Sequence, residues 1–210
     1  MELKKKIVEI IRRLKRDYPS PKVALNFNTP FELLVATILS AQTTDVLVNK
    51  VTQNLFKKYK TIKDYADVSV EAFQKDVSSV NFYKTKAKNI QNAARIIIEK
   101  FHSEVPKTMD ELTSLSGVAR KTANIVLTNV YGINDGIAVD THVKRLSFRL
   151  GLTKNEDPVK VEKDLMDITN KEEWGNLSNL LVLHGRKICQ AKKPKHQECV
   201  LYDICPSNKI

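Results

Sequence analysis

Three thiols near the end of the chain have the spacing of a metal site. All cysteines of the protein, Cys189, Cys199 and Cys205, lie in the stretch CQAKKPKHQECVLYDIC. No secretory signal precedes them, and clustered cysteines in a non-secreted protein favour metal binding over disulfides. A tetrahedral site takes four ligands, so these thiols would supply most of one. From the cysteines alone, the fourth ligand stays open.

A second candidate for chemistry is a tight turn between two short helical patterns. LTSLSGVARKTANIVL predicts a helix, a turn over Ser116–Gly117–Val118–Ala119, and a second helix from about Arg120. Glycine in the turn permits a positive φ or a close backbone approach. The first amides of the second helix lack intrahelical acceptors and could bind a phosphate. The alternative is an ordinary joint between two helices of a bundle.

Lys121 and Asp140 are candidate catalytic side chains. Lys121 would lie in the first turn of the second helix, where the dipole disfavours the ammonium form and leaves more of the amine that a nucleophile needs. Asp140 follows 19 residues later, just before the next helical pattern. The plainer interpretations are a surface lysine and a helix N-cap, and the capping role would also fix the rotamer of Asp140.

The elements around these residues are predicted to be helices. Apolar positions recur at helical spacing in most of the chain, and Thr29-Pro30 before FELLVATILS is a helix start signal. No alternating run is long enough to indicate a sheet. The fold class is therefore all-α, built from many short helices.

The composition indicates a soluble protein with a polyanionic partner. The 210 residues include 35 Lys and Arg against 24 Asp and Glu, a formal net charge of +11. Nucleic acid is the commonest partner of so basic a chain, and a lysine-rich surface without such a partner is the alternative. No apolar run is long enough to span a bilayer, so no membrane association is expected.

The motifs, in their order, resemble the endonuclease III family of DNA base-excision glycosylases. PFELLVATILSAQTTDVLVNK, FYKTKAKNI, LSGVARKTANIVL, IAVDTHVKRLSFRLG and LHGRKIC all match family segments, and together they cover nearly the whole chain. In the hairpin, Ser116 replaces a usual proline and Ala119 a usual glycine. Phosphate binding is expected to survive both changes.

The resemblance implies two helical lobes with a helix-hairpin-helix motif and a C-terminal metal-cluster loop. One lobe would be the central bundle, residues 23–135. The other would join residues 1–22 to 136–210 and carry the cluster loop. A monomer in a prokaryotic cytoplasm, associated with the nucleoid, is expected.

The resemblance also implies a bifunctional DNA glycosylase and abasic-site lyase. Lys121 would attack C1′ of the damaged nucleotide, and Asp140 would help activate the amine and stabilise charge on the sugar. Expected substrates are double-stranded DNA with oxidised pyrimidines or abasic sites. The alternatives are a mismatch glycosylase for uracil or thymine opposite guanine, and a non-catalytic DNA-binding protein.

Further DNA contacts follow from the same resemblance. Gln42 would face the orphaned partner base, and Phe82 would be an apolar wedge, with a core aromatic as the alternative interpretation. Asn81 stands where glycine is common, and asparagine also tolerates a left-handed conformation. The hairpin contacts to phosphate would come from Gly117, Val118, Ala119 and Arg120.

The family's cluster loop has four cysteines separated by six, two and five residues. Here those intervals separate Cys189, His196, Cys199 and Cys205, so histidine holds the second ligand position. These four residues would bind a [4Fe–4S] cluster; the alternatives are Zn²⁺ in a Cys₃His site, and a metal-free tail or three-iron remnant. Lys192, Lys193 and Lys195 would form a metal-braced basic loop for DNA phosphates, with a merely solvated charge run as the alternative.

Overall fold

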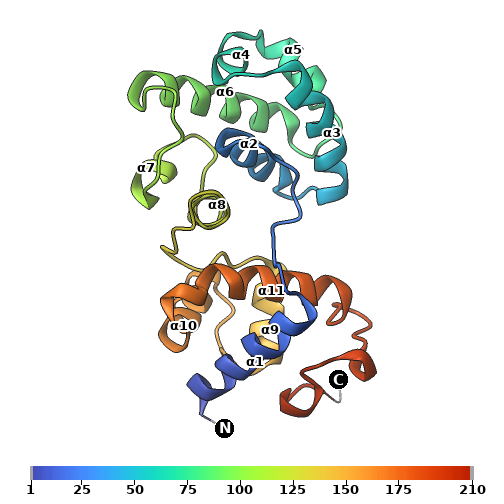
Figure 1. The fold of residues 1–210 in the computed structure, drawn as a ribbon. Coiled ribbons are helices and arrows are strands. Elements are labelled where there is room, and N and C mark those ends of the chain that lie inside the picture. Colours follow the sequence, from blue (N-terminus) through green and yellow to red (C-terminus); the bar gives the residue numbers. More distant parts are fainter. Residues whose placement is uncertain (1, 209–210) are drawn as a thin grey trace. The chain divides into compact units, whose positions relative to one another are not determined.

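A computed structural model describes residues 2–208, and they fold into helices and connecting loops without a strand (Figure 1). The predicted all-α class is confirmed. The chain divides into two compact units. Unit 1 comprises Met1–Val23 and Ile133–Ile210, and unit 2 comprises Ala24–Gly132.

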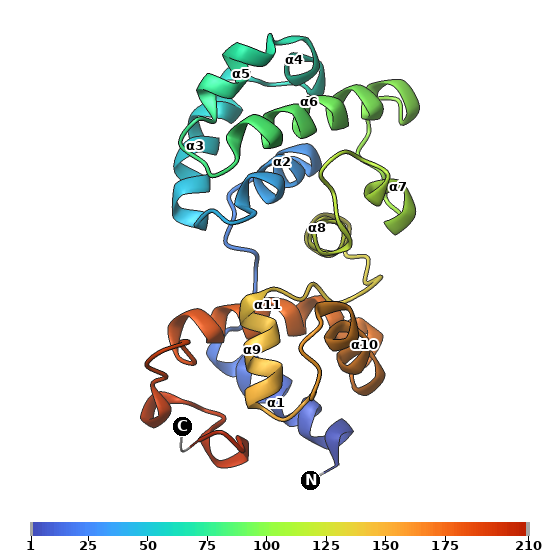
Figure 2. The same cartoon turned by 180° about the vertical axis from the view of Figure 1, so that it is seen from behind.

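Unit 2 is built around helix α2, Pro30–Ser40, which packs against α3, α6 and α8 (Figure 2). The predicted start signal operates: Thr29 accepts a hydrogen bond from the Glu32 amide, and Pro30 fills the first helical position. Most of α2 is buried, which is why its sequence is almost entirely apolar. The other α-helices of the unit are α3 (Asp45–Lys58), α4 (Ile62–Asp67), α5 (Val70–Asp76), α6 (Tyr83–Lys100), α7 (Met109–Thr113) and α8 (Arg120–Val126).

The predicted hairpin is formed by α7 and α8. Thr108 caps α7, and the turn leads into α8 at Arg120, the position that the sequence predicted. Helix α8 runs directly into a π-helical turn, η1, over Leu127–Tyr131. The helical run after the turn is therefore longer than α8 alone.

Unit 1 packs its helices around a core that includes Ile10, Leu14, Leu146, Leu177 and Leu181. Its helices are α1 (Leu3–Asp17), α9 (Thr141–Arg149), α10 (Pro158–Ile168) and α11 (Trp174–Lys187), with short 3₁₀ turns η2 (Lys171–Glu173), η3 (His196–Glu198) and η4 (Tyr202–Ile204). Helix α11 contacts both α9 and α1 (Figure 1).

The segment after α11 folds back onto the same core, and all three cysteines pack against it. Within the described part of the chain, none of the helices has both the length and the apolarity that crossing a membrane requires.

Candidate functional site

Lys121 lies in the first turn of α8, as the sequence predicted, and it is exposed. The preceding turn passes through Gly117 with φ +77°, which only glycine adopts readily. Ala119 is the N-cap and supplies no side-chain hydrogen bond to the helix amides. The first amides of α8 have no intrahelical acceptors, so the turn presents polar donors beside an amine.

Val118 packs inside the hairpin turn and is not part of its exposed surface. Its side chain is buried, and its amide donates to the carbonyl of Leu115 at 3.2 Å. Ala119 and Arg120, by contrast, are exposed. Val118 is one of the hairpin residues expected to face phosphate, but its backbone amide is already used in a hydrogen bond within the protein.

Asp140 caps helix α9. Its Oδ1 accepts hydrogen bonds from the amides of His142 and Val143, each at 2.8 Å. A carboxylate held by two amides at a helix N-terminus has a fixed rotamer, and the dipole favours its charge. Asp140 thus performs the capping role that the sequence allowed, and the cap holds the negative charge in one place.

The two residues expected to insert into DNA both adopt left-handed backbone conformations. Gln42, between α2 and α3, has φ 55°, and Phe82, the N-cap of α6, has φ 57°. The Phe82 side chain is 63% exposed, so its interpretation as a core aromatic is wrong. Asn81 is not among the described residues of positive φ, so asparagine is not needed there for a left-handed backbone.

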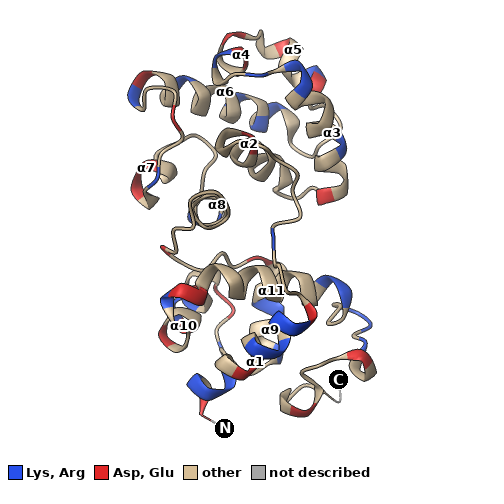
Figure 3. Ribbon diagram, in the orientation of Figure 1, with Lys and Arg blue, Asp and Glu red and all other residues tan. Residues whose placement is uncertain are grey.

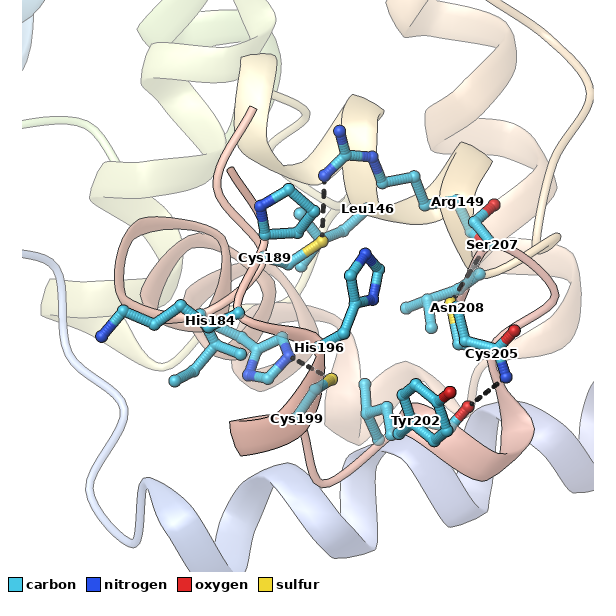
Figure 4. Close-up of a pocket in the computed structure, with 15 residues that line it drawn as sticks. Leu146, Arg149, His184, Cys189, His196, Cys199, Tyr202, Cys205, Ser207 and Asn208 are labelled. Atoms are coloured by element: carbon cyan, nitrogen blue, oxygen red, sulfur yellow. Dashed lines mark hydrogen bonds between the residues drawn. The ribbon is translucent and has the colours of Figure 1, made fainter. Parts of the chain in front are cut away.

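Cys189, His196, Cys199 and Cys205 all line one cavity of unit 1. Figure 4 shows the imidazole of His196 among the three thiols. In residues 2–208, no three His, Cys, Asp or Glu side chains converge closely enough to hold a single metal ion. Three cysteines and one histidine around a shared cavity are a donor set that an iron–sulfur cluster accepts, so the four residues fit the group that the spacing implied.

The walls of this cavity are largely apolar and include Leu146, Leu150, Ile188 and Leu201. Burial raises the pKa of the Cys199 and Cys205 thiols. Because metals bind the thiolate form, loading the site releases protons.

Two hydrogen-bonding side chains approach the sulfur atoms. Arg149 Nη1 lies 3.4 Å from Sγ of Cys189, and His184 Nε2 lies 3.3 Å from Sγ of Cys199 (Figure 4). Nδ1 of His184 lies 3.3 Å from the Tyr18 hydroxyl, and burial lowers the pKa of His184 to about 4. A neutral imidazole that accepts from Tyr18 carries its proton on Nε2 and donates it to the sulfur, as partners of metal ligands commonly do.

The lysine-rich loop begins between the first two ligand positions. Lys192, Lys193 and Lys195 are exposed, and Nζ of Lys195 lies 3.4 Å from Oε2 of Glu198. Figure 3 shows Lys and Arg gathered along the end of α11 and the loop that follows it. The geometry leaves these ammonium groups at the surface, beside the cavity that the four predicted ligands line.

Arg149 also holds the start of this loop. Its guanidinium donates to the carbonyls of Gln190 and Ala191, each at 2.8 Å. Arg145, one turn earlier in α9, donates to the carbonyl of Cys189 at 3.0 Å. The helix that Asp140 caps is therefore hydrogen-bonded to the loop that carries the lysines.

The sequence reasoning missed several residues that support the candidate residues of each unit, namely Lys86 in unit 2 and Arg145, Arg149 and His184 in unit 1. Lys86 left a usable signal: it stands in phase with Ile90, Ala93, Ala94 and Ile97 on the buried face of α6, where a lysine is out of place. The arginines left no such signal, because the carbonyls and the sulfur that they contact around the cavity lie about 40 residues later in the chain.

Comparison with known proteins gives concordant matches. Residues 35–171 match the model of the HhH-GPD superfamily base excision DNA repair proteins, and residues 189–205 match the iron–sulfur binding domain of endonuclease III. The chain is 50% identical over 204 residues to endonuclease III of Synechocystis sp., covering 97% of this chain and 93% of that protein. It is 47% identical over 189 residues to endonuclease III of Bacillus subtilis, covering 90% and 86%.

Among solved structures, the chain resembles a trapped endonuclease III–DNA covalent intermediate in an estranged-adenine complex. The TM-score is 0.93 at 42% sequence identity, and the match covers 100% of this chain and 98% of that one.

Proposed function

Because the chain belongs to the endonuclease III family, we propose that it is a bifunctional base-excision repair enzyme. It is a DNA glycosylase with abasic-site lyase activity, and its partner is DNA. The observation that carries this function is the exposed Lys121 in the first turn of the hairpin helix, since a lyase needs an amine nucleophile.

In the proposed reaction, the free amine of Lys121 attacks C1′ and displaces the damaged base. The sugar then opens to a Schiff base with Nζ. Loss of a C2′ proton breaks the 3′ C–O bond by β-elimination and releases the 3′ phosphate, which cuts the strand. The carboxylate of Asp140, held by its hydrogen bonds from two backbone amides, stabilises positive charge on the sugar.

The reaction requires the nucleotide to leave the duplex, because C1′ is inaccessible while the base is stacked. We propose that Gln42 and Phe82 fill the gap, Gln42 against the partner base and Phe82 by stacking. The exposure of the Phe82 ring supports this role, because an aromatic ring at the surface is available to stack on a base. The hairpin turn, with Gly117, Ala119 and Arg120, would bind phosphate.

The cofactor is a [4Fe–4S] cluster, and we propose Cys189, His196, Cys199 and Cys205 as its ligands. Bound by these residues, the cluster would crosslink a segment of chain, and base removal is not a redox reaction. Their shared cavity and the N–H donors beside two of the sulfurs support this assignment. The residues that then act on DNA are Lys192, Lys193 and Lys195, which the crosslinked loop would hold against phosphates.

Borohydride reduction in the presence of abasic-site DNA tests the nucleophile. We expect wild type and Lys160→Ala to form a covalent complex and Lys121→Ala to form none. Lys160 is the matched control, because it is an exposed lysine in the first turn of another helix, α10. DNA binding by wild type without any trapped complex would exclude the lyase activity, and trapping by Lys121→Ala would exclude Lys121.

We further propose oxidised pyrimidines as the lesion class, with the enzyme acting as a monomer on DNA of a prokaryotic nucleoid. Single-turnover rates on duplexes with thymine glycol, or with uracil or thymine opposite guanine, decide the lesion class. Faster release of the mismatched bases would favour the mismatch alternative. Sedimentation of the protein with and without DNA measures its oligomeric state.

A further inference from the structure

Unit 2 contains two strained positions that lie beside each other. Gln42 and Phe82 are both non-glycine residues with φ near 55°, and a left-handed conformation costs about 1–2 kcal/mol for such a residue. Strain of this kind persists where the surroundings hold it, and it concentrates at functional positions. The contacts that hold these two residues therefore indicate what the strain is for.

The first of these contacts comes from Asn81. Its side-chain amide donates to the carbonyl of Gln42 at 2.5 Å, and its backbone amide donates to Oγ1 of Thr43 at 3.3 Å. Asn81 directly precedes Phe82, so one residue joins the two loops. A glycine at this position could not make the side-chain bond.

The second contact comes from Lys86, in the first turn of α6. Its Nζ lies 2.7 Å from the carbonyl of Leu39, 2.5 Å from that of Ala41 and 3.1 Å from Oγ1 of Thr43. The side chain is 6% exposed, and burial lowers its pKa. A cation here satisfies carbonyls at the C-terminal end of α2, which the helix itself leaves without donors.

Lys86 is also linked to Phe82 through the backbone, because its amide donates to the Phe82 carbonyl at 3.1 Å. The start of α6 is thus hydrogen-bonded to both ends of the segment Ala41–Thr43. A buried ammonium is costly unless its donors are used, so its presence among three acceptors indicates a position built for it.

We propose that Asn81 and Lys86 are positioning residues that hold Gln42 and Phe82 as one preassembled wedge before DNA binds. This inference rests on the proposed insertion of those two residues. Two independent loops would have to be ordered on binding, whereas a preformed wedge avoids that cost. Neither Asn81 nor Lys86 needs to touch the nucleotide.

The wedge is required only where a duplex must be opened. An abasic site in single-stranded DNA has no partner base to replace, so the lyase reaction there needs Lys121 but not the wedge. In single-turnover cleavage, Asn81→Ala should lower the rate on duplex abasic DNA by about tenfold, which corresponds to one interaction of about 1.4 kcal/mol. Its rate on the same strand without a complement should stay near that of wild type.

Asn54→Ala is the matched control. Asn54 is also exposed and belongs to the same unit, on helix α3. This variant should cleave both DNA forms like wild type. Equal losses on both DNA forms for Asn81→Ala, or no loss on either, would overturn the proposal.

A double-mutant cycle separates positioning from an independent contact. If Asn81 acts only by positioning Gln42 and Phe82, then adding Asn81→Ala to the Gln42→Ala/Phe82→Ala variant should not slow cleavage of duplex DNA any further. Multiplication of the two losses would contradict the proposal. Lys86→Met should show the same duplex-specific loss, and if it does not fold, the Asn81 cycle decides.

Binding to a duplex with 2-aminopurine opposite a stable abasic-site analogue gives a readout that does not need catalysis. Wild type should change the fluorescence strongly as the wedge enters, and Asn81→Ala should need more protein for the same change. A wild type that cleaves neither DNA form would refute the proposed function, while this titration would still test the wedge. An unchanged titration for Asn81→Ala would overturn the preassembly.

Discussion

The backbone of Gly117 lies directly against the side chain of Asn89. A Cβ added to Gly117 would stand 2.7 Å from Nδ2 and 2.8 Å from Cβ of Asn89, which belongs to helix α6. The hairpin turn and α6 are therefore in contact without room for another atom. The phosphate-binding turn that we propose is held in place by this packing.

Gly117→Ala should consequently destabilise the protein and weaken DNA binding. The positive φ costs about 1–2 kcal/mol, and the overlap with Asn89 adds about 1–3 kcal/mol. Urea unfolding measures the loss of stability, and affinity for an abasic-site duplex measures the loss of DNA binding.

Gly132→Ala separates the two causes of that destabilisation. Gly132 has φ +66°, but a Cβ there would meet nothing within 4 Å. This variant should show the conformational cost alone. Equal destabilisation by the two substitutions would show that the overlap with Asn89 contributes nothing.

Asp140→Asn should keep the helix cap and lose the charge. Asparagine caps about as well as aspartate, so the free energy of unfolding should change little. The rate of base release should fall about 100-fold, because a fixed charge opposite the developing positive sugar is removed. Single-turnover kinetics and urea unfolding measured on the same preparation separate the two effects.

Asp157 provides the matched control for the cap. Its Oδ1 accepts amide hydrogen bonds from Val159 and Lys160, each at 3.0 Å, at the start of α10. Asp157→Ala and Asp140→Ala should each cost about 1 kcal/mol of stability. Only Asp140→Ala should lose activity. Equal activity losses in the two variants would show that Asp140 acts only as a helix cap.

The sequence alone predicts the parts of this site that depend on local signals. The start of α2 at Pro30, the place of Lys121 in the first turn of α8, and the capping by Asp140 all follow from helix-terminus rules, and the structure confirms them. The common cavity of the four proposed cluster ligands follows similarly, because only short segments separate them.

The remaining features depend on contacts between distant segments. The ammonium of Lys86 reaches carbonyls more than 40 residues earlier in the chain, and Arg149 reaches carbonyls of the lysine loop from α9. The left-handed backbones of Gln42 and Phe82 could not be predicted from residue type either, because neither type favours that conformation. No pattern within a single helix encodes these interactions.

His196→Cys should bind the cluster more firmly than wild type. Thiolate adds a negative charge where imidazole is neutral, so the reduction potential of the cluster should fall relative to wild type. Visible absorbance during exposure to an iron chelator should decay more slowly, and trapping by borohydride should be unchanged. His196→Ala should lose iron faster than wild type.

Metal analysis of the three proteins tests the ligand assignment itself. Iron and inorganic sulfide in equal amounts are expected in wild type and His196→Cys after anaerobic purification. A colourless wild type with one zinc per chain would show that the four residues form a Cys₃His zinc site and not a cluster site. Identical decay in wild type and His196→Ala would show that His196 is not a ligand.

Replacing Lys192, Lys193 and Lys195 together by alanine should weaken DNA binding without preference for the lesion. Phosphate contacts carry no base information, so affinity for intact and damaged duplexes should fall by the same factor. The slope of log affinity against log salt should become shallower by about 0.9 for each phosphate that the protein no longer neutralises. Titrations at several salt concentrations give this slope directly.

The matched control removes three exposed lysines elsewhere in unit 1, at Lys154, Lys160 and Lys163. It changes the net charge equally, so any general effect of charge appears in both variants. If the loop binds phosphates, the slope of log affinity against log salt should become shallower in the loop variant than in the control variant. Equal slopes in the two variants would make the loop a solvated charge run, and the cluster would then stabilise a segment that does not touch DNA directly.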